Sequence, residues 1–88
     1  MKIKKSGLVD ALKVLGRVVS QTSPVEVQRS VRFLGVGTQV WLTATDGVES
    51  VMVEVIGDAG EMEDFAVEYK ALRELIRSTR GGEVEVTA

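Results

Sequence analysis

The chain has 88 residues, 44% of them hydrophobic, and a formal net charge of −2. These values fit a single globular domain and exclude both a disordered chain and a protein that is basic overall, so attraction to a polyanion requires charge segregated onto one surface. The chain has neither Cys nor His, which excludes disulfides and removes the commonest general base and metal ligand.

The N-terminal segment predicts a strand followed by a helix. Residues 2–5 alternate around an inward Ile3, and Ser6 is a plausible N-cap. Apolar residues then recur at helical spacing over residues 8–19. Lys13 and Arg17 lie one turn apart, away from the apolar face, and form a short basic stripe.

The middle of the chain predicts an antiparallel meander after a long loop. Residues 20–29 are polar and read as a loop of about ten residues, long enough to be mobile or functional. Strand patterns follow at Val31–Val36, Gln39–Thr45 and Glu49–Ile56. Asp46-Gly47 between the last two is a strong hairpin signal.

The C-terminal third predicts a loop, a second helix and a final strand. Residues 57–64 form an acidic loop, and Phe65–Val67 is a brief strand. The helix covers Glu68–Arg80 and ends at Gly81-Gly82 in the usual glycine manner. Residues 83–87 then alternate, with two valines inward.

The second helix has two faces. Its apolar stripe consists of Leu72, Leu75, Ile76 and Thr79, and its basic stripe of Lys70, Arg73, Arg77 and Arg80. At about 1.5 Å per residue the cations span roughly 15–18 Å, and duplex DNA offers about one phosphate charge per 1.7 Å. A solvated face is the ordinary interpretation of such a stripe, and a polyanion-binding face is the alternative.

The element order indicates an α+β fold. It is β-α-β-β-β followed by (β)-α-β in one domain over residues 1–88, with both helices packed on one face of an antiparallel sheet. Both basic stripes then lie on the helical side of the protein. The opposite sheet face carries Arg32, Leu34, Trp41, Met52, Glu54, Glu83 and Glu85.

Several short sequence segments resemble a known family. The opening Met1-Lys-Ile3, the hairpin word Leu42-Thr-Ala-Thr-Asp46 and the run from Val67 to Val86 are similar to the N-terminal domain of the bacterial DNA polymerase III beta subunit, the sliding clamp. The resemblance covers nearly the whole chain. A clamp protomer has three such domains, however, and strands expected after Val86 are missing. The chain is then a fragment, a degenerate relative or a small protein that assembles several copies.

The resemblance implies a DNA-clamp-like module that encircles or tethers duplex DNA. In that family helices line a basic central hole and touch phosphates without reading sequence, as suits a processivity factor in DNA replication. Carried over by position, the DNA-binding candidates are Lys13, Arg17, Lys70, Arg73, Arg77 and Arg80, with Arg29 as a weaker one. A replicative polymerase or a clamp loader is a further candidate partner.

An incomplete sheet leaves backbone groups unpaired at its edges. We therefore expect a homo-oligomer that assembles through strand edges. A protein-interaction or assembly module that keeps the clamp fold without binding DNA is the alternative function.

Other features give no active site. Trp41 is interpreted as an interface or packing residue, with stacking on a base as the alternative. The acidic cluster Asp58, Glu61, Glu63 and Asp64 lacks the spacing of a calcium loop and is interpreted as a solvated loop. We expect no enzyme, no cofactor and no metal. The apolar runs are too short for a membrane span, and we expect a cytoplasmic protein.

Overall fold

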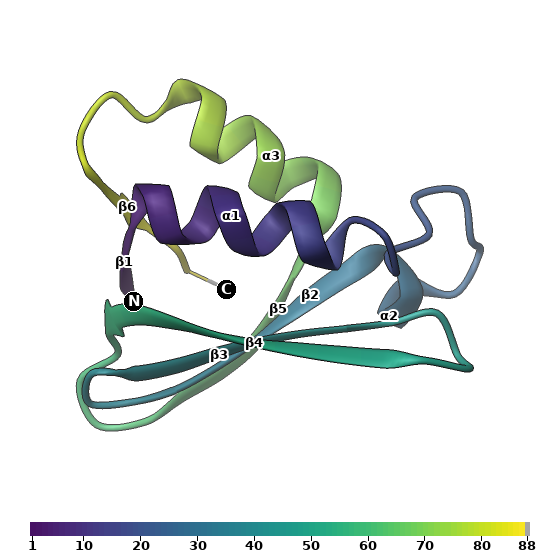
Figure 1. The fold of residues 1–88 in the computed structure, drawn as a ribbon, viewed down its shortest axis with the longest axis horizontal. Coiled ribbons are helices and arrows are strands. Elements are labelled where there is room, and N and C mark those ends of the chain that lie inside the picture. The colour runs from purple at the N-terminus through teal and green to yellow at the C-terminus, as the bar shows by residue number, and fades with distance from the viewer. Residues whose placement is uncertain (88) are drawn as a thin grey trace.

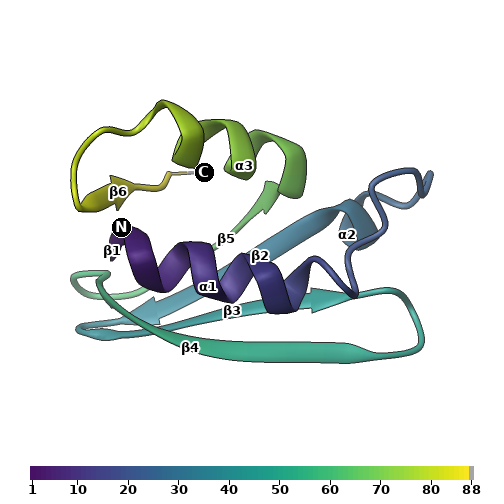
Figure 2. The ribbon, with the colours of Figure 1, turned by 45° about the horizontal axis from the view of Figure 1, so that its top comes forward.

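Two helices cover one face of a curved antiparallel sheet (Figure 1). The computed structural model describes residues 1–87. Its elements in chain order are β1 Lys2–Lys4, α1 Lys5–Leu15, α2 Glu26–Arg29, β2 Ser30–Val36, β3 Gln39–Thr45, β4 Ser50–Asp58, β5 Glu63–Glu68, α3 Tyr69–Ser78 and β6 Glu83–Glu85. The strand order is β5-β2-β3-β4-β1-β6. The predicted α+β class and helical layer are confirmed, as Figure 2 also shows.

The meander forms because its strands alternate in polarity and its turns have the required glycines. β2 pairs with β3 and β3 with β4, all antiparallel. Gly37 and Gly47 have φ of 60° and 93° at the two hairpin turns, a conformation that favours glycine. The Asp46 carboxylate accepts the N–H groups of Glu49 (2.7 Å) and Val48 (2.8 Å), which closes the second turn.

The Asp46 carboxylate makes the second hairpin sensitive to acid. Its bonds from the Glu49 and Val48 N–H groups lower the pKa of Asp46 from its ordinary value. A depressed carboxyl pKa stabilises the fold above the ordinary value and stops doing so as pH falls through the depressed one. We expect Asp46→Ala to lower the urea midpoint at about pH 7, and the difference from wild type to shrink as the pH is lowered below about 3.9, the ordinary pKa of Asp. A pH-independent difference would contradict this.

The core lies between the sheet and the helices. Phe33 on β2 and Phe65 on β5 are cross-strand partners, and their rings stack with centroids 5.4 Å apart, a favourable aromatic pairing. The largest fully buried side chains are Phe33, Ile3, Leu8, Leu15, Leu42, Leu72, Val31, Val40, Val84 and Val86. They come from both helices and from β1, β2 and β3 together with the C-terminal segment around β6, so the core joins both ends of the chain.

The first helix differs from its predicted bounds. It begins at Lys5, directly after β1, and Ser6 is not its cap; the N-cap is Lys4. The Lys5 N–H donates to the Gly82 carbonyl oxygen (2.8 Å). This hydrogen bond to the residue before β6 fixes the backbone where the helix starts. The helix ends at Leu15, with Gly16 as C-cap, which places Arg17 in the following turn.

Three other boundaries also differ. The predicted loop 20–29 contains the short helix α2. The Ser30 hydroxyl, directly after this helix, donates a hydrogen bond to the Glu26 carbonyl oxygen at its start (3.0 Å). The acidic loop is shorter than predicted, because β4 continues to Asp58 and β5 begins at Glu63. The glycine pair does not end α3: Thr79 is its extended C-cap, and its hydroxyl donates to the Leu75 carbonyl (2.7 Å).

Gly57 is the residue of β4 at which pairing with β3 ends and pairing with β1 begins. A Cβ at this position would lie 2.7 Å from the Lys2 carbonyl oxygen and 3.1 Å from Val40 Cγ2. We expect Gly57→Ala to destabilise the fold by about 1–3 kcal/mol, measured by urea unfolding. Gly82→Ala is the control, since a Cβ there meets nothing within 4 Å. Equal urea midpoints for both variants would show that the close approach of β4 to β1 at Gly57 tolerates a side chain.

Candidate nucleic-acid interface

A groove of about 280 Å³ runs between the two long helices on the helical side of the protein. It is lined by Val9, Leu12, Lys13, Tyr69, Arg73, Ile76 and Arg77. We call it the helical groove. Its floor is apolar and its rim carries cations, because each helix buries one stripe in the core and turns the neighbouring stripe outward.

The two walls of the helical groove are tied to each other at both ends. Lys5 Nζ at the start of α1 donates to the Thr79 carbonyl oxygen at the end of α3 (2.5 Å). At the opposite end the Tyr69 hydroxyl donates to the Leu12 carbonyl oxygen (3.4 Å). The helices therefore run antiparallel, and an ammonium group meets the negative end of α3, where it is favoured.

Tyr69 is a groove residue that the sequence analysis did not single out. Its ring lies beneath the Arg73 guanidinium, with Cζ 5.9 Å from the ring centroid, a cation–π contact. The signal in the sequence is the spacing of four residues between the two side chains, which places them one above the other on a helix. A Cβ on Gly16 would lie 2.5 Å from the Tyr69 hydroxyl, so the end of α1 leaves room for this ring.

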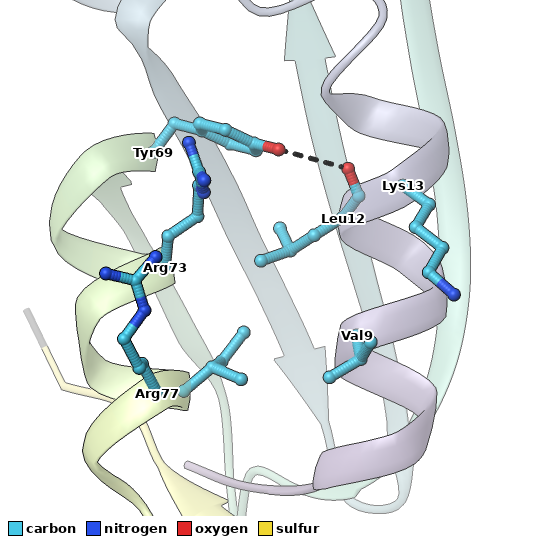
Figure 3. Close-up of a pocket in the computed structure, with 7 residues that line it drawn as sticks. Val9, Leu12, Lys13, Tyr69, Arg73 and Arg77 are labelled. Atoms are coloured by element: carbon cyan, nitrogen blue, oxygen red, sulfur yellow. Dashed lines mark hydrogen bonds between the residues drawn. The ribbon is translucent and has the colours of Figure 1, made fainter.

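Three of the six predicted DNA-binding residues share the helical groove: Lys13 on α1 and Arg73 and Arg77 on α3. Figure 3 shows both arginine side chains running along α3 toward Tyr69, whereas the Lys13 side chain extends away from α3. The structure thus brings cations from both helices to the same side of the sheet.

The other three predicted residues lie outside the helical groove. Lys70 lines a separate depression with Gln21, Arg29 and Glu68. Arg17 follows the end of α1, and Arg80 follows the end of α3. All six predicted side chains are exposed, and within residues 1–87 none of them forms an ion pair. Their charges are therefore available to a ligand.

The arrangement of strands and helices is shared with solved bacterial clamps. The DNA polymerase III subunit beta from Pseudomonas aeruginosa matches 99% of this chain with a TM-score of 0.79 and 22% identity. Caulobacter crescentus pol III beta matches 94% with a TM-score of 0.81 and 19% identity. The chain has the sliding-clamp domain fold. The Helicobacter pylori beta clamp bound to DNA ligase peptide has the same clamp fold over 100% of this chain, with a TM-score of 0.81 and 15% identity.

The clamp fold confirms the resemblance drawn from the short sequence segments. The chain spans about a quarter of the solved clamps, 23% of the Caulobacter protein and 25% of the Pseudomonas protein. No protein-family model matches the sequence, and no curated protein matches it. At these identities the likeness establishes the clamp fold, and the function has to be argued from this chain's own surfaces.

Two general features of the described part of this clamp-fold chain are also relevant. Among residues 1–87, none of the helices has the length and apolarity needed to span a bilayer. The same residues contain no group of three or more Asp and Glu side chains placed to hold a metal ion. The acidic residues near β5 have other contacts: Asp64 binds Arg32, and Glu63 lies 3.4 Å from the Met1 amino group.

Proposed function

We propose that this chain is a sliding-clamp-like module that contacts duplex DNA without reading its sequence and serves as a processivity factor in DNA replication. The observation that carries the proposal is the helical groove, which is lined by Lys13 on α1 and by Arg73 and Arg77 on the antiparallel α3. The module performs no catalysis of its own. It acts in the cytoplasm, with a replicative polymerase or a clamp loader as its protein partner.

The charge of α3 suits a phosphate backbone. This helix has three cations and the single carboxylate Glu74. Arg73 and Arg77 lie one turn apart, about 6 Å along the helix axis, while each DNA strand presents a phosphate about every 3.4 Å of duplex axis. The two guanidinium groups can therefore reach nearby phosphates of one strand. Contacts of this kind position a protein but do not specify a sequence.

Salt dependence tests the DNA proposal. If Lys13, Arg73 and Arg77 each neutralise one phosphate, the logarithm of the binding constant should fall with the logarithm of salt concentration with a slope of about −2.7. Fluorescence anisotropy of two labelled duplexes of unrelated sequence, between about 50 and 200 mM salt, measures this slope. Equal affinities for both duplexes are expected. Absence of binding at low salt, or affinity that depends on sequence, would contradict the proposal.

Several copies are needed for a module of this size to surround DNA, and β4 offers an edge for assembly. Over Ser50–Ile56, β4 pairs with β3 on one side, while its pairing with β1 covers only Gly57 and Asp58. Within residues 1–87 the other side of β4 is thus an open edge, which can pair with a strand of another copy.

The open edge also favours the second candidate function, an assembly module with the clamp fold that does not bind DNA. We expect the mass measured by light scattering to rise with protein concentration in either case. DNA binding by the assembled form supports the first function, and assembly without binding at low salt supports the second. A monomer at all concentrations would contradict assembly through this edge.

A further inference from the structure

The sheet has an apolar patch on the face opposite the helices. The pairing register places Asp64, Leu34, Trp41 and Glu54 in one line across β5, β2, β3 and β4. Met52 and Ile56 flank Glu54 on β4 and are therefore diagonal neighbours of Trp41, within about 7–8 Å. We call the set Leu34, Val36, Trp41, Met52 and Ile56 the sheet-face patch.

The sheet-face patch is exposed to solvent over much of its area. Ile56 is 75% exposed, Met52 65% and Val36 47%, and Leu34 and Trp41 are half-buried. Figures 1 and 2 show both long helices on the other face of the sheet. Trp and Met are enriched where proteins bind one another, and a contiguous apolar patch of this kind is typical of an interaction surface.

Asp64 and Glu54, the two carboxylates in this line of residues across the sheet, differ in whether a cation pairs with them. Arg32 donates to both Asp64 oxygens, at 2.9 and 2.6 Å, and this bond lowers the pKa of Asp64. Within residues 1–87 Glu54 forms no ion pair. Glu54 is exposed and is the cross-strand register partner of Trp41, so an aromatic residue and an acidic residue occupy neighbouring positions on this face of the sheet.

We propose that the sheet-face patch binds a cationic amphipathic helix of another protein. Apolar side chains of that helix cover Met52 and Ile56, and one of its Lys or Arg side chains lies over the Trp41 ring and against Glu54. Aromatic rings and carboxylates both attract such cations, the ring through its negative face. A second copy of this chain is the poorer occupant, because it would bring two uncompensated Glu54 carboxylates onto the same interface.

This patch is distinct from the helical groove, so its ligand and DNA occupy opposite sides of the protein. Trp41 is the only tryptophan of the chain, and it lies in the patch. Its fluorescence therefore reports binding to the sheet face and is insensitive to an anionic ligand held by the helices. The two proposals can fail separately.

The test titrates the protein with a synthetic amphipathic helical peptide composed of Leu and Lys, and separately with the same pattern built from Leu and Glu. We expect the Leu–Lys peptide to shift the Trp41 emission to shorter wavelength in a saturable way, and the Leu–Glu peptide to leave it unchanged. Met52→Lys should weaken binding of the Leu–Lys peptide about tenfold or more. Glu54→Gln should also weaken it, because the substitution removes the carboxylate that the peptide's cation contacts. Val48→Lys is the matched control, since it adds the same charge at an exposed hairpin position.

Four results would overturn the proposal. One is the absence of a Trp41 shift with the Leu–Lys peptide, and another is an equal shift with both peptides. The third is a Trp41 emission that shifts with protein concentration alone by as much as the Leu–Lys peptide shifts it, because a second copy on the patch buries Trp41 whereas strand pairing at the β4 edge leaves the sheet face open. Retained affinity in Met52→Lys relative to Val48→Lys would also contradict the assigned location. Circular dichroism confirms that the variants remain folded.

Discussion

The double substitution Arg73→Glu and Arg77→Glu is expected to abolish binding to duplex DNA while leaving the domain folded. Both side chains are exposed on α3 and line the helical groove. Reversing them replaces two phosphate contacts by two repulsions, and the loss of two contacts alone lowers the magnitude of the salt slope by about 2. Anisotropy titration at low salt measures the effect, and circular dichroism at the same temperature checks the fold.

Lys2→Glu and Lys4→Glu together form the matched control for this charge reversal. They change the net charge by the same amount, and both residues line a different depression, between β1, β4 and β6. If DNA binding is located at the helical groove, the control keeps most of its affinity. If the control loses as much DNA affinity as the arginine variant, the attraction comes from the net charge of the protein and not from α3.

Leu72→Ala is expected to have the largest effect on stability. Leu72 is the one buried residue of α3 and is 0% exposed. Truncating a fully buried leucine costs about 2–5 kcal/mol, and a chain of this size has a thin stability margin. For a domain of this length each kcal/mol lowers the melting temperature by about 4–8 °C. We expect a fall of at least about 8 °C in a thermal melt.

Glu74→Ala is the matched control for the leucine variant. It lies on the same helix, two residues away, and its side chain is exposed. We expect its melting temperature to stay close to that of the wild type, because surface substitutions generally change stability by less than about 0.5 kcal/mol. Equal melting temperatures for Leu72→Ala and wild type would mean that the packing of α3 on the sheet does not depend on the buried Leu72 side chain.

The meander and the amphipathic character of α3 were predictable because both depend on local periodicity. Gln39–Thr45 has the predicted bounds, since polar and apolar residues alternate along it and strong turn signals flank it. Element ends were less predictable where the deciding bond came from afar. Lys5 starts α1 because the Gly82 carbonyl holds its N–H, and no local pattern around residue 5 contains that information.

The same division applies to the candidate interface. The spacing of Arg73 and Arg77 placed them on one helix face, but the hydrogen bond from Tyr69 to the Leu12 carbonyl depends on how two helices distant in the chain pack. Arg17 and Arg80 continue the basic stripes in the sequence, and the structure places both beyond the ends of their helices. The sequence spacing of the cations continues past the end of each helix, but residues beyond the end no longer have helical backbone geometry and so do not stay on the same face.

Residue order alone determined the α+β class, the strands of the meander and the two faces of the second helix, because each follows from the polarity of neighbours a few positions apart. Only the tertiary structure decided which cations share the helical groove and which carboxylate remains uncompensated. Arg32 and Asp64 are 32 residues apart in the chain, and they meet because β5 pairs with β2. Contacts of this kind depend on how distant segments pack, and a one-dimensional pattern does not record that packing.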